Sequence, residues 1–101
     1  MAFDKAKTLR AAEKYLELGK IPAAIKEYCK IVEGEPEDLT TLNMLGDLYA
    51  RVGDQAAAIS CFRHIAEHYR EQDFVWKAIA MYKKIDRLNP PQWLGQPTLA
   101  K

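Results

Sequence analysis

Apolar side chains recur every three or four positions along most of this 101-residue chain, and no stretch alternates as a β-strand does. The pattern predicts an all-α protein. Breaks come at Gly19, Gly34, Gly53, Gln72-Asp73 and Asn89-Pro90-Pro91. Asp38 and Asp54 are expected to cap the helices that follow them. The five expected helices cover, approximately, residues 4–18, 21–34, 39–52, 55–72 and 74–88.

The chain matches itself when it is shifted by 34 residues. AAEKYLELGK at 11–20 aligns with LGDLYARVGD at 45–54, and AAIKEYCKI at 23–31 aligns with AAISCFRHI at 57–65. A fixed period of this length indicates stacked helical hairpins that cannot bury their apolar faces alone. Such arrays commonly serve as docking surfaces for other proteins.

A third unit departs from this period. KAIAMYKKI at 77–85 matches 57–65 at an offset of only 20 residues, which leaves no room for a new first helix. Tyr69 precedes Ala78 by nine positions, as Tyr49 precedes Ala58. We therefore infer that the helix at 55–72 serves both as the second helix of unit two and as the first of unit three. The alternative is an ordinary capping helix at 74–88 that resembles the others by chance.

These features resemble the tetratricopeptide repeat. Arg70 departs from the family pattern where a closing proline is expected. The positions that fit it best are Leu42, Leu45, Gly46, Tyr49, Ala58 and Phe62, and those that fit more loosely are Thr8, Ala11, Ala12, Tyr15, Ala24, Tyr28 and Pro36.

The resemblance covers residues 5–90 and implies an α-solenoid of about five helices in a right-handed superhelical stack. We expect a repeat domain at 1–90, with units at 5–38 and 39–72 and a partial or overlapping third unit to 90. An irregular tail at 91–101 follows. The dominant core is expected to contain Leu45, Tyr49, Ala58, Ile59, Phe62, Ile65, Tyr69, Ile79 and Tyr82.

Composition and charge narrow the function. A net charge of +1 offers no field that would recruit nucleic acid or an anionic membrane. No stretch approaches the roughly 20 apolar residues of a membrane helix, and MAFDKAKTLR lacks the apolar centre of a signal peptide. Cys29 and Cys61 are too few for a secreted disulfide scaffold, so we expect reduced thiols and a cytoplasmic protein.

Catalytic and metal chemistry have little support. Cys61, His64 and His68 lie at i, i+3 and i+7 of one helix, a spacing that could turn three ligands toward one face. No second ligand cluster accompanies them, so packing and surface roles are the simpler interpretation. We expect no cofactor, no metal and no enzymatic activity.

The resemblance places a ligand groove on the first helix of each unit. Chaperone-docking members bind a terminal carboxylate there with lysine and asparagines, but this chain has Leu9, Glu13 and Met44 at those positions. Asn43, Asp47 and Arg51 are the preferred contact set, since they share one face at i, i+4 and i+8. The full candidate set is Leu9, Glu13, Leu16, Asn43, Asp47, Arg51, Arg63, Glu67 and Arg70.

Two functions follow from these observations. The first is a non-catalytic scaffold that binds a peptide or protein segment of unknown identity on its concave face. The second is a structural or oligomerisation segment of a longer array, with metal binding a remote third. Ile79, Met81, Tyr82 and Ile85 have no following helix to cover them. We expect Trp93 and Leu94 to fold back on them, or two copies to pair there.

Overall fold

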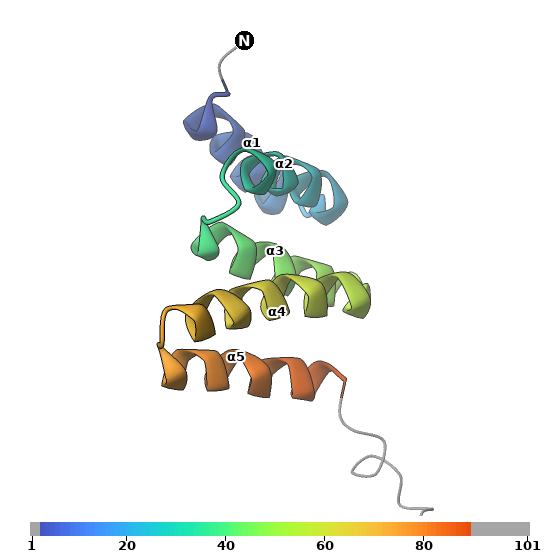
Figure 1. Cartoon of the computed structure of the whole chain (residues 1–101). Coiled ribbons are helices and arrows are strands. Elements are labelled where there is room, and N and C mark those ends of the chain that lie inside the picture. The colour runs from blue at the N-terminus through green and yellow to red at the C-terminus, as the bar shows by residue number, and fades with distance from the viewer. Residues whose placement is uncertain (1–2, 90–101) are drawn as a thin grey trace, which may run out of the picture.

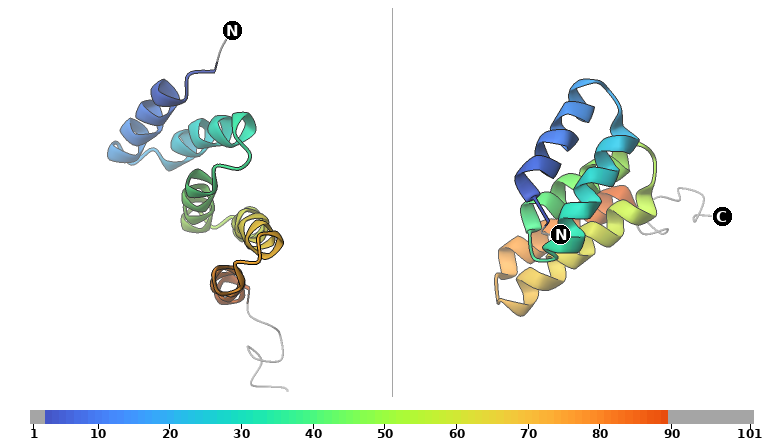
Figure 2. Two further views of the ribbon diagram at one scale, coloured as in Figure 1. Left: turned by 60° about the vertical axis from the view of Figure 1, so that its left-hand side comes forward. Right: turned by 90° about the horizontal axis from the view of Figure 1, so that it is seen from above.

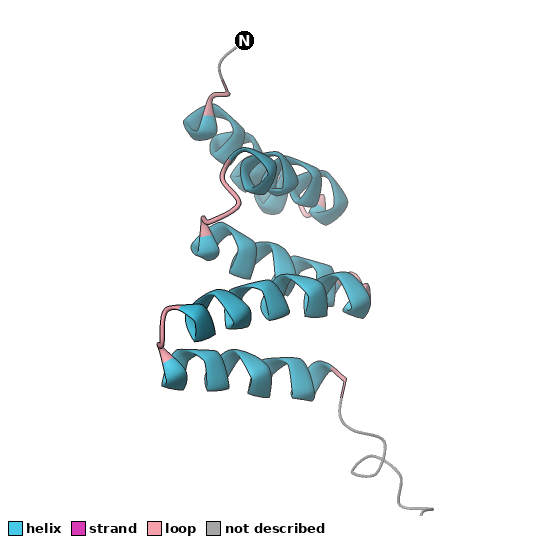
Figure 3. Cartoon of the chain, viewed as in Figure 1, coloured by secondary structure: helices cyan, strands magenta, loops and turns pink. Residues whose placement is uncertain are grey.

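The computed structural model describes residues 3–89, which form five α-helices and no strand (Figure 3). The all-α prediction is therefore confirmed. The predicted tail, with Trp93 and Leu94, lies outside the described residues. Within 3–89, none of the helices has the length and apolar content that a membrane crossing needs. The helices are α1 (Lys5–Glu17), α2 (Ile21–Gly34), α3 (Leu39–Arg51), α4 (Gln55–Glu71) and α5 (Val75–Leu88).

The helices stack in chain order, with α1 and α2 at one end and α5 at the other (Figure 1). The main contacts join consecutive helices. In the left view of Figure 2, α3, α4 and α5 are seen nearly end-on while α1 and α2 are seen along their length. The first hairpin is therefore turned relative to the helices that follow.

Aspartate side chains begin three of the helices. Asp4, Asp38 and Asp54 each accept a hydrogen bond from the backbone N–H three residues later, at 3.1 Å in every case. Each bond satisfies one of the donors that a helix start leaves unpaired. The caps predicted at Asp38 and Asp54 are confirmed, and Asp4 takes the same role one residue before α1.

One turn occurs three times. Its central residue has a left-handed backbone, with φ of 74° at Gly19, 87° at Gly53 and 63° at Asp73. The next N–H donates at 2.8–2.9 Å to a tyrosine carbonyl five residues earlier. Glycine adopts this conformation freely, and aspartate is among the few other residues that tolerate it. The three accepting carbonyls belong to Tyr15, Tyr49 and Tyr69.

The repeated turn bears on how α4 is used. It closes α1–α2, α3–α4 and α4–α5, whereas a different loop joins α2 to α3. Helix α4 also contacts α5 about as extensively as it contacts α3, and the α2–α3 contact is smaller. Helix α4 thus belongs to two hairpins of the same kind, which the shared-helix interpretation requires. The unit boundaries themselves stay a prediction.

Small residues lie where helices meet most closely. An added Cβ at Gly46 would lie 2.6 Å from Phe62 Cε1 and 3.1 Å from Cys61 Cβ, so α3 approaches α4 only because Gly46 has no side chain. The Phe62 ring, 1 % exposed, has no free space into which to move. Five alanines of the helices are also buried: Ala12, Ala24, Ala58, Ala66 and Ala78.

The predicted core is correct in its centre and wrong at one edge. Leu45, Ala58, Phe62 and Ile65 are buried, and Tyr49, Ile59 and Tyr69 pack against them while half-buried. Ile79 and Tyr82 are instead exposed, each at 36 %. The reason is that α5 packs on α4 with one side only, and no other helix within residues 3–89 covers its outer side.

Replacing Gly46 with alanine tests the close contact. Alanine normally stabilises a helix interior by about 1 kcal/mol relative to glycine. Here we expect Gly46→Ala to lower the free energy of unfolding by about 1–3 kcal/mol, because its Cβ overlaps Phe62. Urea unfolding would measure this. The double variant Gly46→Ala, Phe62→Leu should lose less stability than the sum of its two single variants, because leucine relieves the overlap with the new Cβ. Losses that simply add would contradict the explanation.

Candidate functional site

A hollow of about 420 Å³ lies between α1 and α3 and has the buried Tyr28 of α2 at its base. It is larger than the hollows described below, and its size falls within the range of small ligand pockets. The residues that line it are Lys5, Leu9, Glu13, Tyr28, Asp38, Thr40, Thr41 and Met44.

Helical spacing explains how these side chains converge. Lys5, Leu9 and Glu13 lie at i, i+4 and i+8 on one face of α1, and Thr40 and Met44 lie at i and i+4 on α3. The two rows face each other across α2. Leu9 and Met44 supply apolar surface, while Lys5 and Glu13 supply charge.

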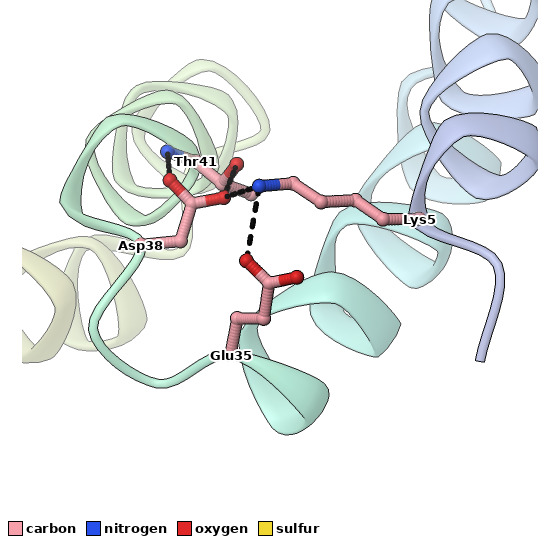
Figure 4. A network of polar contacts seen from close by, with 4 residues as sticks. All are labelled: Lys5, Glu35, Asp38 and Thr41. Carbon is pink, nitrogen blue, oxygen red and sulfur yellow. Dashed lines mark hydrogen bonds and ion pairs between the residues drawn. The ribbon is translucent and has the colours of Figure 1, made fainter. Parts of the chain in front are cut away.

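A polar network holds one end of the hollow (Figure 4). The Lys5 ammonium lies 2.9 Å from Asp38 Oδ2 and 3.0 Å from Glu35 Oε1. The Thr41 hydroxyl donates to Asp38 Oδ2 at 2.7 Å, and the Thr41 backbone N–H donates to the other carboxylate oxygen. One carboxylate therefore caps α3 and binds the first turn of α1, which fixes the two walls relative to each other.

This network shifts two pKa values. Burial works to raise the pKa of Asp38, but hydrogen bonds from Thr41 and Lys5 outweigh it and hold that pKa below the ordinary 3.8. The hydrogen bonds to Asp38 and Glu35 raise the pKa of Lys5. The charge of Lys5 at this end is thus already matched by two carboxylates of the chain itself.

Glu13 has no such partner. It is exposed, and no cation within residues 3–89 forms an ion pair with it. Burial is the main reason that the pKa of Tyr28 is raised, and the charge of Glu13 adds to the effect. The Glu13 carboxylate therefore lies close enough to Tyr28 to affect its pKa, and it is free to bind a cation.

The predicted contact set on α3 is partly occupied by the chain itself. Lys84 of α5 donates to Asn43 Oδ1 at 3.1 Å and lies 2.9 Å from Asp47 Oδ1. The same ammonium lies 4.3 Å from the centre of the Phe62 ring. Asn43 and Asp47 thus help to join α5 to α3.

The other predicted groove residues do not gather at the hollow. Leu16 packs against the core, and Arg51, Arg63 and Arg70 are exposed. Glu67 lines a separate hollow of about 130 Å³. Of the nine candidates, Leu9 and Glu13 are therefore the two that line the α1–α3 hollow.

The cysteine and the two histidines of α4 line two neighbouring hollows. Cys61 is buried and lines a hollow of about 190 Å³ with His64, and His64 also lines the separate hollow of about 130 Å³ together with His68 and Glu67. Burial, with a smaller effect of Cys29, raises the pKa of the Cys61 thiol to about 11, so the thiol is protonated at neutral pH. Within the described part of the chain, no three His, Cys, Asp or Glu side chains are placed to hold a metal ion.

Lys5, Thr40 and Lys84 were not expected at a site, and Met44 was expected only at a position of the missing carboxylate clamp. Lys5 and Met44 could have been found, since each continues an i, i+4 row along a face of α1 or α3. Lys84 had no such signal, because its contacts with α3 depend on the angle at which α5 crosses the stack.

One comparison with known proteins gives a match. Residues 39–67, which cover α3 and most of α4, match the tetratricopeptide repeat family. A search of curated proteins gives no match to this chain.

Two substitutions at Asp38 separate its cap from its charge. Asparagine keeps the capping oxygen, so we expect Asp38→Ala to lower the free energy of unfolding by about 1 kcal/mol more than Asp38→Asn at pH 7. Because the pKa of Asp38 is lower in the folded chain than in the unfolded one, its charged contribution is present at neutral pH and lost as the pH falls through these values.

Urea unfolding at pH 7 and at about pH 2 would check both statements. The difference in free energy of unfolding between wild type and Asp38→Asn should shrink at low pH. The difference between Asp38→Asn and Asp38→Ala, which reports the cap, should remain. A difference that stays constant with pH would contradict the role of the charge.

Proposed function

We propose that the chain is a non-catalytic binding module, because residues 39–67 match the tetratricopeptide repeat, which generally mediates protein–protein interaction. In this proposal it binds an extended segment of a partner protein in the α1–α3 hollow. The observation that carries the proposal is the hollow itself, with apolar walls and one free carboxylate at its rim.

The apolar part of the hollow suits one side chain of moderate size. Met44 is 40 % exposed although it lies on a helix whose opposite side is core, and Leu9 stands across from it. Covering these two side chains would remove apolar surface from water, at about 25 cal/mol per Å². A leucine, methionine or phenylalanine of the partner fits this requirement.

The charge of the rim favours a cationic neighbour to that side chain. Lys5 is held by Glu35 and Asp38, so the Glu13 carboxylate is left as the charge available to a ligand. A lysine or arginine beside the apolar residue would bind it, whereas a free terminal carboxylate would be repelled. The ligand class is therefore a segment with an apolar residue next to a basic one.

A peptide array tests this choice. Twelve-residue peptides would carry a central Leu, Met or Phe flanked by Lys or Arg in one series and by Asp or Glu in the other. We expect the basic series to bind with dissociation constants in the micromolar range typical of a shallow, preformed site. Fluorescence anisotropy at two salt concentrations would show weaker binding at higher salt.

Variants locate the binding. Glu13→Gln and Met44→Ala should each weaken the binding of the best basic peptide by about 3- to 10-fold, since the first removes the ion pair and the second an apolar contact. Glu67→Gln is the matched control, because Glu67 is an exposed glutamate in a different hollow. If Glu67→Gln weakens binding and Glu13→Gln does not, the ligand lies elsewhere and the assignment is wrong.

A further inference from the structure

The outer side of α5 carries the largest exposed aromatic of the described chain. Trp76 is 82 % exposed, and Phe74 and Val75 beside it are each at least half exposed. Ile79 and Tyr82 extend this apolar surface along the helix. Soluble proteins seldom leave a contiguous apolar surface of this kind uncovered, so it points to a partner.

The two sides of α5 are clearly divided. Ala78 and Ile85 are buried, and Met81 and Leu88 pack against the core. At 100° per residue, the opposite side carries an apolar first half and a charged second half. In order along the helix, the outer residues are Trp76, Ile79, Ala80, Lys83, Asp86 and Arg87.

We propose that this face binds a second copy of the chain, with the two α5 helices antiparallel across a two-fold axis near Ala80. In that arrangement, Trp76 of each copy lies against Lys83 and Arg87 of the other, so apolar and cationic halves meet twice. Cations stack favourably on aromatic faces. The chain already contains such contacts, since Lys77 lies 5.0 Å from the Phe74 ring centre and Lys84 lies over Phe62.

Helix geometry agrees with this pairing. The small side chain of Ala80, which is exposed, permits the two helix axes to approach closely at the centre. A helix of this length spans about 21 Å, so the contact is smaller than the roughly 800 Å² per partner of a stable interface. The dimer is therefore weak and reversible. A second copy is favoured over an unrelated partner because one face carries both the exposed Trp76 ring and the cations Lys83 and Arg87 that can stack on such a ring.

Sedimentation equilibrium of the full 101-residue chain tests the proposal. We expect the mean mass to rise from monomer toward dimer between roughly 10 µM and 1 mM. Trp76→Ala should raise the dissociation constant at least about tenfold, since aromatic residues at interface centres carry much of the binding. Leu18→Ala, which changes an exposed apolar residue at the far end of α1, is the matched control and should have no effect.

A cross-link reports the geometry. Ala80→Cys should form an intermolecular disulfide under mild oxidation, while Ser60→Cys, on the exposed side of α4, should not. Circular dichroism would show that the variants remain folded. A chain that stays monomeric at 1 mM would overturn the proposal and indicate that residues 90–101 or another protein covers α5. Association that Trp76→Ala leaves unchanged, or equal cross-linking at both positions, would also overturn it.

Discussion

Close approach of neighbouring helices is the constraint on which the rest of this structure depends. Gly46 lets the ring of Phe62 lie directly against the backbone of α3, and alanines on all the helices but α3 are buried in the stack. Because packed interiors leave little free volume, these positions fix the spacing of the stack. The spacing in turn sets where the rows of α1 and α3 stand, and hence the width of the hollow between them.

Electrostatics acts at the places where packing is thinner. The α2–α3 contact is the smaller one, and there Asp38 caps α3 while it binds Lys5 of α1. At the other end, Lys84 joins α5 to α3 through Asn43 and Asp47. Both lysines span helices that share little apolar surface. Polar contacts thus help to set how α1 and α5 are oriented relative to α3.

Local features of the fold could be predicted from the sequence because each depends on a few neighbouring residues. The caps at Asp38 and Asp54 and the turn at Gly19 belong to this class. Ile79 received two conflicting expectations, because helical periodicity put it on the apolar stripe of the core while no later helix was expected to cover it, and its exposure agrees with the second. Of the predicted groove residues, Leu9 and Glu13 line the α1–α3 hollow, and their contact with a ligand stays a prediction. The contact of Asn43 with Lys84 depends on how α5 crosses α3.

The thin joint between α2 and α3 has a mechanical consequence. The α1–α3 hollow lies across this joint, and Lys5 bridges the joint to Glu35 and Asp38. The angle between the two walls of the hollow therefore depends on ion pairs that salt weakens. Ionic strength would then act on the shape of the hollow as well as on the charge of a ligand that binds there.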